Sequence, residues 1–267
     1  MSENPSASKQ FAAQVDQIPV IGYEPKTRRD GVQFVIWLPG LSMTKEAMNQ
    51  QLQDLAGAGF VALSFDPWQH GARGTESGQA FITRVFGNFR RYMWPIIGQT
   101  TLDTLRVIDW AVSELGVNNE VYMGGLSMGG DIAIAAAGIE PRIKRVAALV
   151  ATPDWLRPGM QAINNSGTIL PPGTPDAYAQ YFYDTLNPLT HLEHYARSAH
   201  GPAITFECGA DDTHVPADGA QRFQAAFRQQ YPALAERIRV NLIPDAGHMD
   251  SMKNPAFWQN ALAWFSQ

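Results

Sequence analysis

The chain has 267 residues, of which 45% are hydrophobic and 17% charged, and its formal net charge is -5. This length and hydrophobicity can bury a complete core, which excludes a disordered protein and favours one domain over residues 1–267. Lysine and arginine are spread thinly along the chain. No basic run can neutralise phosphates, so we expect no nucleic-acid partner.

The single cysteine and the polar N-terminus predict a cytoplasmic protein. Cys208 is the one cysteine, so no disulfide can form within the chain, and its apolar run predicts a small buried strand residue. The first ten residues lack the basic start and apolar stretch of a secretory signal. No apolar stretch is long enough to cross a bilayer, so we expect no membrane partner. Composition leaves the oligomeric state open, with a homodimer as one alternative.

The first half of the chain alternates between short apolar runs and helical patterns. Runs at 33–38 and 60–65 predict buried strands, with a helix between them from 45 to about 56. One or two further strands are expected near 17–23. A long helical pattern follows from about 99 to 115.

The second half continues the same rhythm. Further strands are predicted at 121–124, 146–150, 203–208 and 239–243, and further helices at 127–137, 218–229 and 254–266. Continuously apolar strands separated by helices indicate a mostly parallel, doubly wound α/β sheet with helices on both faces.

Residues 152–200 interrupt this rhythm. The segment contains several prolines and a cluster of aromatic residues, and it is too long for an ordinary connection. We expect a partly helical, cap-like insertion over the carboxyl edge of the sheet. An aromatic patch can equally form an oligomer interface, which is the competing interpretation.

The motif Gly125-Leu-Ser127-Met-Gly129 has the pattern G-x-S-x-G and lies between a predicted strand and a predicted helix. This context is typical of a nucleophile elbow, a sharp turn that exposes a reactive serine. The next amide, that of Met128, is then one expected donor to an oxyanion. A helix-capping serine is the alternative interpretation.

A serine nucleophile needs a base, and the base needs a residue that orients it. Two later strands end in the loops Gly209-Ala-Asp-Asp-Thr-His-Val-Pro216 and Pro244-Asp-Ala-Gly-His248. The carboxyl ends of parallel strands share one edge of the sheet, so these loops can meet Ser127. His248 is the predicted base. His70 is expected in a turn or pocket wall, and His214 is expected to point elsewhere.

Together these motifs resemble the α/β-hydrolase superfamily. Within it, the chain is similar to the dienelactone-hydrolase-like and prolyl-oligopeptidase-like branch, which includes small bacterial carboxylesterases. The segment 59–66 and the His70-Gly71 pair that follows it add to the likeness. The resemblance implies that Asp212, rather than Asp211, orients the base, and that the amide of Leu41 is the second oxyanion donor.

The predicted function is hydrolysis of a small-molecule carboxylic ester through an acyl-enzyme, with no cofactor. Trp68, Tyr181 and Phe182 are candidates for substrate contacts. No pair of histidines has metal-ligand spacing with a carboxylate on a helix, so no metal site is expected. Two alternatives are an amide or thioester hydrolase using the same residues and a non-catalytic ligand receptor on this fold.

Overall fold

An eight-stranded sheet forms the centre of the computed structural model, which describes residues 8–76, 78–163, 167–197 and 201–267. The sheet order is β1-β2-β4-β3-β5-β6-β7-β8. The strands are β1 (Lys9–Val15), β2 (Ile18–Glu24), β3 (Phe34–Leu38), β4 (Val61–Phe65), β5 (Val121–Leu126), β6 (Ile143–Leu149), β7 (Ala203–Gly209) and β8 (Ile238–Ile243). From β4 to β8 neighbouring strands are parallel, whereas β2 pairs antiparallel with both β1 and β4.

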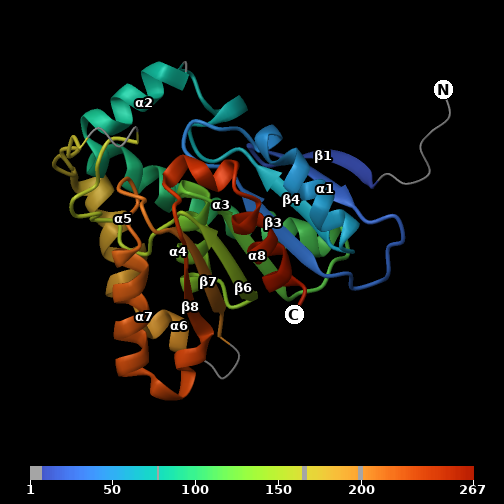
Figure 1. The fold of residues 1–267 in the computed structure, drawn as a ribbon. Helices are drawn as coiled ribbons and strands as arrows, with labels where there is room; N and C mark the ends of the chain where they lie inside the picture. Colours follow the sequence, from blue (N-terminus) through green and yellow to red (C-terminus); the bar gives the residue numbers. More distant parts are fainter. Residues whose placement is uncertain (1–7, 77, 164–166, 198–200) are drawn as a thin grey trace.

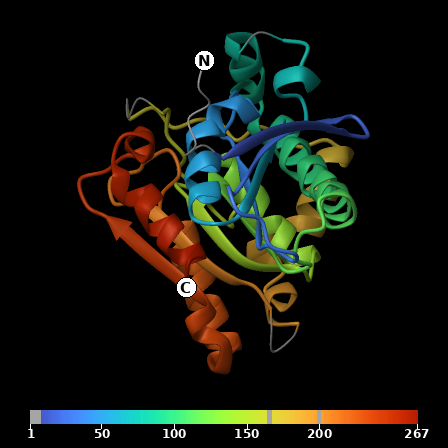
Figure 2. The ribbon, with the colours of Figure 1, turned by 90° about the vertical axis from the view of Figure 1, so that its right-hand side faces the viewer.

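Helices cover both faces of this sheet, as the sequence predicted (Figure 1). The helices are α1 (Asn49–Gly57), α2 (Gly78–Gly87), α3 (Phe89–Glu114), α4 (Met128–Ile139), α5 (Ala177–Leu186), α6 (Glu193–Ala196), α7 (Asp218–Gln230) and α8 (Pro255–Phe265). Figure 2 shows the β1–β2 hairpin (dark blue) and β8 (orange-red) on different sides of the molecule, consistent with their places at the two ends of the sheet. Within the described ranges, no helix is both long and apolar enough to span a bilayer.

Alternation along β3 explains why the sheet needs helices on both sides. Phe34 and Ile36 belong to the apolar cluster that contains α3 and α4, while Val35 and Trp37 belong to the cluster that contains α1 and α8. All five residues of β3 are buried, because successive side chains of a strand point to opposite faces. Cys208 is likewise buried in β7, and burial raises the pKa of its thiol to about 12. The prediction of a small buried strand residue is confirmed.

The longest helix begins earlier than the sequence pattern indicated. α3 starts at Phe89 instead of near residue 99, and it contains Pro95. The side chain of Asn88 caps its start by accepting a hydrogen bond from the amide of Arg91. The short helix α2 just before it was not predicted from the sequence.

The segment 152–200 does not form one continuous cap. In α5, Phe182 packs on α3, and in α6 the buried hydroxyl of Tyr195 donates to the carbonyl of Ile134 in α4 at 2.9 Å. The part that reaches the carboxyl edge of the sheet is the loop around the bridge between Gln161 and Ile169. Residues 164–166 and 198–200 of this segment, His200 included, lie outside the described residues.

Gly98 allows α5 to pack closely against α3. A Cβ atom built at Gly98 lies 2.1 Å from the Phe182 ring, so Gly98→Ala forces the helices apart. We expect this variant to lower the free energy of unfolding by about 1–3 kcal/mol in urea titrations, despite the higher helix propensity of alanine. In the control Gly57→Ala the new Cβ meets nothing within 4 Å, so stability should not fall. Equal stability of Gly98→Ala and the wild type would contradict this account of the packing.

Candidate active site

Ser127 lies at a sharp turn between β5 and α4. Its backbone has φ 53° and ψ -117°, a conformation that costs a non-glycine residue energy and is common at functional sites. The turn depends on two glycines, because a Cβ atom at Gly129 would lie 2.3 Å from the carbonyl oxygen of Leu38, and one at Gly125 would lie 2.6 Å from the Gly129 backbone. The G-x-S-x-G spacing therefore allows α4 to begin against β3.

A continuous chain of hydrogen bonds joins the three residues of the predicted triad. His248 Nε2 lies 3.0 Å from Ser127 Oγ, and His248 Nδ1 lies 2.7 Å from Asp212 Oδ2. Both His248 and Asp212 are buried. The serine follows β5, the aspartate follows β7 and the histidine follows β8, so three parallel strands deliver them to one edge of the sheet.

Backbone amides hold the Asp212 carboxylate in place. Its Oδ1 accepts hydrogen bonds from the amides of His214 and Val215, at 2.9 and 2.8 Å. The other oxygen then faces His248, whose Nδ1–H donates to it, and Nε2 keeps its lone pair towards the serine hydroxyl. Asp211 has an exposed side chain, and its amide donates to the carbonyl of Ala246. The geometry thus brings Asp212, not Asp211, to the histidine.

The two predicted oxyanion donors lie on either side of Ser127. Met128 is the first residue of α4, and Leu41 follows Gly40, whose Cβ position is 3.7 Å from Ser127 Cβ. Among the described residues, neither amide donates a hydrogen bond to an acceptor within the chain. Ser42, next to Leu41, has φ 64°, so the backbone is strained on both sides of the site.

A cavity of about 350 Å³ opens beside Ser127 and His248. Its walls are mostly apolar, and the described residues that line it include no aspartate, glutamate, lysine or arginine. The apolar side chains come from Leu41, Met43, Ile82, Phe86, Leu126, Ile163, Met249 and Met252. Helix α2 and the loop containing Ile163 therefore contribute to the substrate space next to the serine.

Trp68, Tyr181 and Phe182 do not line this cavity, contrary to the sequence prediction. Trp68 is half-buried, and its backbone amide donates to Thr100 in α3. Phe182 is buried against Gly98, and Tyr181 is 61% exposed on α5. The aromatic cluster around Tyr181 indicated that these side chains are packed, but it did not show which element they pack against. The overlooked signal was the apolar i, i+4 pair Ile82 and Phe86, which marks one face of a helix.

His214 lies beside the base instead of pointing elsewhere, which corrects the sequence prediction. The centre of its ring is 4.8 Å from that of His248, and its Nδ1 lies 2.7 Å from the carbonyl oxygen of Gln161. Burial, reinforced by the charge of His248, lowers the pKa of His214 to about 4. A neutral imidazole therefore lines the cavity near pH 7. His70 is buried in the loop after β4, edge-on to Phe81.

A buried ion pair connects the nucleophile helix to the loop after β6. Asp131 in α4 pairs with Arg157, and its Oδ1 accepts a hydrogen bond of 2.8 Å from the amide of Thr152. Both charged side chains are almost completely buried. Removing one partner of such a pair leaves a buried, uncompensated charge, so the pair keeps this loop attached to α4.

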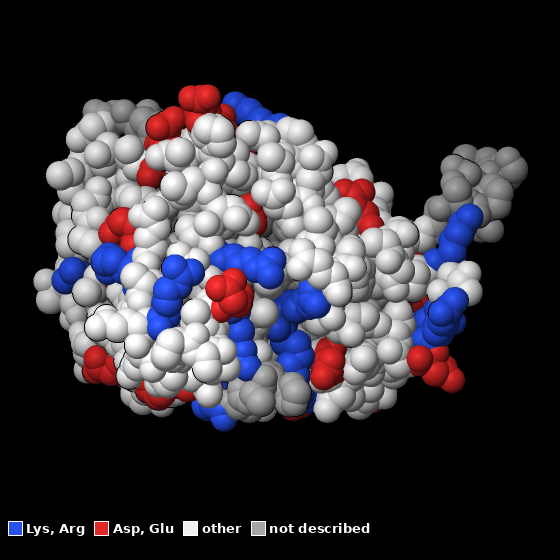
Figure 3. All heavy atoms as spheres, turned by 60° about the horizontal axis from the view of Figure 1, so that its bottom comes forward, with Lys and Arg blue, Asp and Glu red and all other residues white. Residues whose placement is uncertain are grey.

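A larger cavity, about 560 Å³, lies at the opposite edge of the sheet, where the strands begin. Figure 3 shows lysine and arginine side chains gathered around the middle of this face. Among the described residues that line it are Lys144, Arg145 and Arg239, but no serine, cysteine or histidine. Size alone therefore does not identify the candidate site, because the predicted nucleophile Ser127 lines the smaller cavity.

The sequence profile of the prolyl oligopeptidase family matches residues 48–267. The chain belongs to this family. The match includes Ser127, Asp212 and His248, whereas β3 and the Leu41 loop precede it. The comparison with curated proteins gave no match.

Solved structures similar to this family member include both esterases and peptidases by description. A protein from Klebsiella pneumoniae described provisionally as a dienelactone hydrolase has a TM-score of 0.70 and 18% identity, and the alignment covers 98% of this chain and 99% of that one. The Pyrococcus furiosus esterase Pf2001 has a TM-score of 0.63 and 17% identity, and the alignment covers 98% of this chain and 93% of the esterase. The acylaminoacyl peptidase of Pyrococcus horikoshii has a TM-score of 0.69 and 15% identity, and the alignment covers 97% of this chain and 40% of the peptidase. At these identities the likeness establishes the α/β-hydrolase fold.

The low pKa of His214 makes the stability of this prolyl oligopeptidase family member depend on pH. Folding lowers the pKa from 6.5 to about 4, so the unfolded chain binds more protons between these values, and stability must fall as pH falls through this range. The contribution is about 2–3 kcal/mol by pH 4. We expect His214→Gln to lose less stability than the wild type between pH 7 and 4.5 in urea unfolding. Identical losses would mean that His214 does not carry this effect.

Proposed function

We propose that this chain is a serine hydrolase that cleaves carboxylic esters through an acyl-enzyme intermediate. The observation that carries the proposal is the hydrogen-bonded sequence from Asp212 through His248 to Ser127, ending at a strained turn beside an apolar cavity. A helix-capping role for Ser127 is disfavoured, because its side chain makes no capping hydrogen bond to α4.

In the proposed mechanism His248 acts first as a base and then as an acid. Its Nε2 takes the proton from Ser127 Oγ while the oxygen attacks the ester carbonyl carbon. The imidazolium that forms is stabilised by Asp212, and it returns the proton to the leaving alcohol. Water then enters, His248 removes its proton, and attack on the acyl-enzyme releases the carboxylic acid and restores Ser127.

The negative charge that develops on the carbonyl oxygen needs donors fixed in advance. The amides of Leu41 and Met128 are the proposed donors, because neither has an intramolecular acceptor among the described residues. An amide already oriented towards the serine costs little reorganisation when the charge appears. One such donor contributes about 3–4 kcal/mol to transition-state stabilisation in comparable sites.

The cavity supports an uncharged acyl or alcohol group as the substrate moiety next to Ser127. Its described lining offers no carboxylate to pair with a free α-amino group and no cation to pair with an acidic substrate. The similar structures described as an esterase and, provisionally, as a dienelactone hydrolase support the cleavage of an ester bond.

Hydrolysis of an amide bond is the second candidate. The family is that of prolyl oligopeptidase, and one similar structure is an acylaminoacyl peptidase. Nitrophenyl esters of increasing acyl length, compared with acylated amino-acid nitroanilides, distinguish the two bonds directly. We expect kcat/KM to be higher for the esters by more than their intrinsic reactivity explains. A preference for the anilides would replace the ester proposal with the peptidase one.

Substituting the nucleophile tests the mechanism itself. Ser127→Ala removes the attacking oxygen and should reduce ester turnover by about 10⁴-fold or more with little change in stability. It should also abolish labelling by a fluorophosphonate. Ser251→Ala is the matched control, because Ser251 lines the same cavity and should leave labelling intact. Continued labelling of Ser127→Ala, or loss of labelling in Ser251→Ala alone, would refute the assignment.

The side chains that line the cavity are expected to select the length of the acyl chain. Phe86→Ala enlarges the space beside His214, where the two rings meet at 5.6 Å between centres. We expect the ratio of kcat/KM for long over short acyl esters to rise by about tenfold or more. Tyr181→Ala, on the exposed face of α5, is the control and should leave the ratio unchanged. A shift in the control but not in Phe86→Ala would restore the cap role first predicted for α5.

A further inference from the structure

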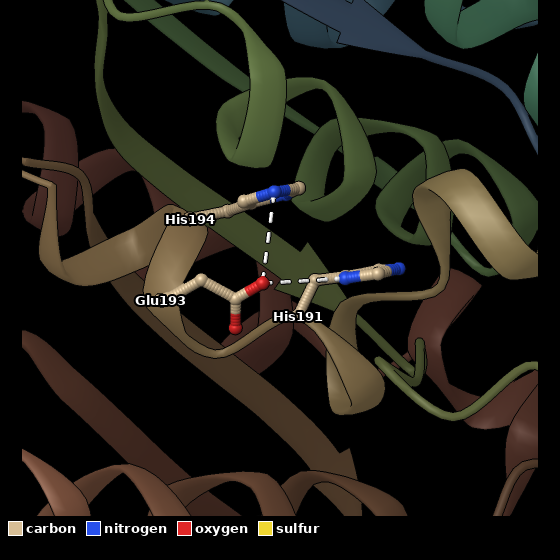
Figure 4. A group of neighbouring side chains, drawn as sticks. All are labelled: His191, Glu193 and His194. Atoms are coloured by element: carbon tan, nitrogen blue, oxygen red, sulfur yellow. Dashed lines mark hydrogen bonds and ion pairs between the residues drawn. The ribbon is translucent and has the colours of Figure 1, made fainter.

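Away from the active site, His191, Glu193 and His194 bring three possible metal ligands together (Figure 4). His191 directly follows the short helix η3 (Pro188–Thr190), and the other two residues begin α6. One ligand atom of each residue lies within 4.8 Å of those of the other two. Figure 4 shows one oxygen of Glu193 between the two imidazoles.

The distances between these atoms match the size of a small cation site. His191 Nδ1 lies 3.4 Å from Glu193 Oε1, and His194 Nε2 lies 3.8 Å from the same oxygen. Bonds of about 2.1 Å from a tetrahedral zinc ion place its ligand atoms about 3.4 Å apart. Rotation of the side chains would then direct the imidazole lone pairs to one ion.

The hydrogen bond made by Nε2 of His191 leaves Nδ1 free to bind a metal ion. Nε2 of His191 lies 2.7 Å from the carbonyl oxygen of Asp184, and a carbonyl only accepts, so Nε2 carries the proton. In the neutral ring Nδ1 then has a lone pair that faces the Glu193 carboxylate. Histidines that bind metals usually donate their second N–H to a carbonyl or carboxylate in this way.

The backbone around the cluster keeps the ligands near one another without a metal. The amide of His191 donates to Pro188, and the amide of His194 donates to His191, at 3.1 and 3.0 Å. Next to the cluster, the buried Tyr195 hydroxyl anchors α6 to α4. The two imidazole rings stack with centres 4.9 Å apart. Such preorganisation reduces the entropy lost when an ion binds.

We propose that His191, Glu193 and His194 bind one divalent transition-metal ion, with Zn²⁺ as the first candidate. Imidazole ligands favour Zn²⁺, Cu²⁺ or Ni²⁺ over Mg²⁺ and Ca²⁺, which prefer oxygen ligands. The side chains are partly exposed, so water completes the coordination. Sequence analysis expected no metal site because it sought ligands spaced along one helix, whereas here a turn supplies His191.

The bound ion would connect two parts of the segment 152–200. His191 is joined to the end of α5 through Asp184, and Glu193 and His194 belong to α6. Coordination of all three therefore clamps α6 to α5. Because the ion binds only the folded arrangement, it stabilises the fold in proportion to its concentration.

The test is metal binding by untagged protein that has been stripped with a chelator. Calorimetric titration with ZnCl₂ should show one site per chain, and Zn²⁺ should raise the melting temperature. His191→Ala and His194→Ala should each weaken binding by at least about tenfold. Both residues are partly exposed, so the metal-free variants should melt like the wild type; titration with Co²⁺, followed by its visible absorption, reports the ligands independently.

A pair of charge-matched variants separates ligation from general attraction. Glu193→Gln removes a proposed ligand, whereas Asp184→Asn removes an equal charge nearby and keeps the carbonyl that accepts from His191. We expect the first to weaken Zn²⁺ binding and the second to leave it nearly unchanged. Equal losses in both, wild-type affinity in the His191→Ala/His194→Ala double variant, or no saturable binding by the wild type would overturn the proposal.

Discussion

The close approach of α4 to β3 is the constraint on which the rest of the site depends. Gly125 and Gly129 allow this approach, because any side chain there would collide with the backbone of the turn or of β3. The turn between β5 and α4 consequently holds Ser127 at a positive φ, with its hydroxyl at the carboxyl edge of the sheet. The roles proposed for the His248 ring and the Leu41 amide both require the serine hydroxyl to stay at that position.

The polar contacts beside Ser127 differ in kind from the ion pair that joins its helix to the loop after β6. Next to the nucleophile, one carboxylate is satisfied by two amides and one histidine, and a neutral His214 completes the wall. The Asp131–Arg157 pair, in contrast, lies in the interior between α4 and the loop after β6. Burying that pair costs free energy unless both members remain, so it couples the loop after β6 to the nucleophile helix.

The motifs that match the family and the side chains proposed to select the substrate lie in different parts of this molecule. The family match includes the elbow and the two late loops, while the similar structures include an esterase and a peptidase by description. The wall of the cavity beside Ser127 includes side chains from α2 and from the loop containing Ile163, which we propose select the substrate. These segments contribute little to the sheet, so they can vary without changing the chemistry.

The sequence alone predicted the parallel strands, most of the helices and the order of serine, acid and base, because period, glycine spacing and strand ends are local signals. It missed α2 and the start of α3 at Phe89. The choice of Asp212 over Asp211 came from the resemblance of a short loop to the α/β-hydrolase superfamily. Tertiary structure decided what lies against what: α5 packs on α3 instead of covering the serine, α2 lines the cavity, and His214 meets His248. It also gathered His191, Glu193 and His194 around one point. Such contacts depend on how helices pack across a sheet and how a turn directs side chains, and neither is encoded by spacing along the chain.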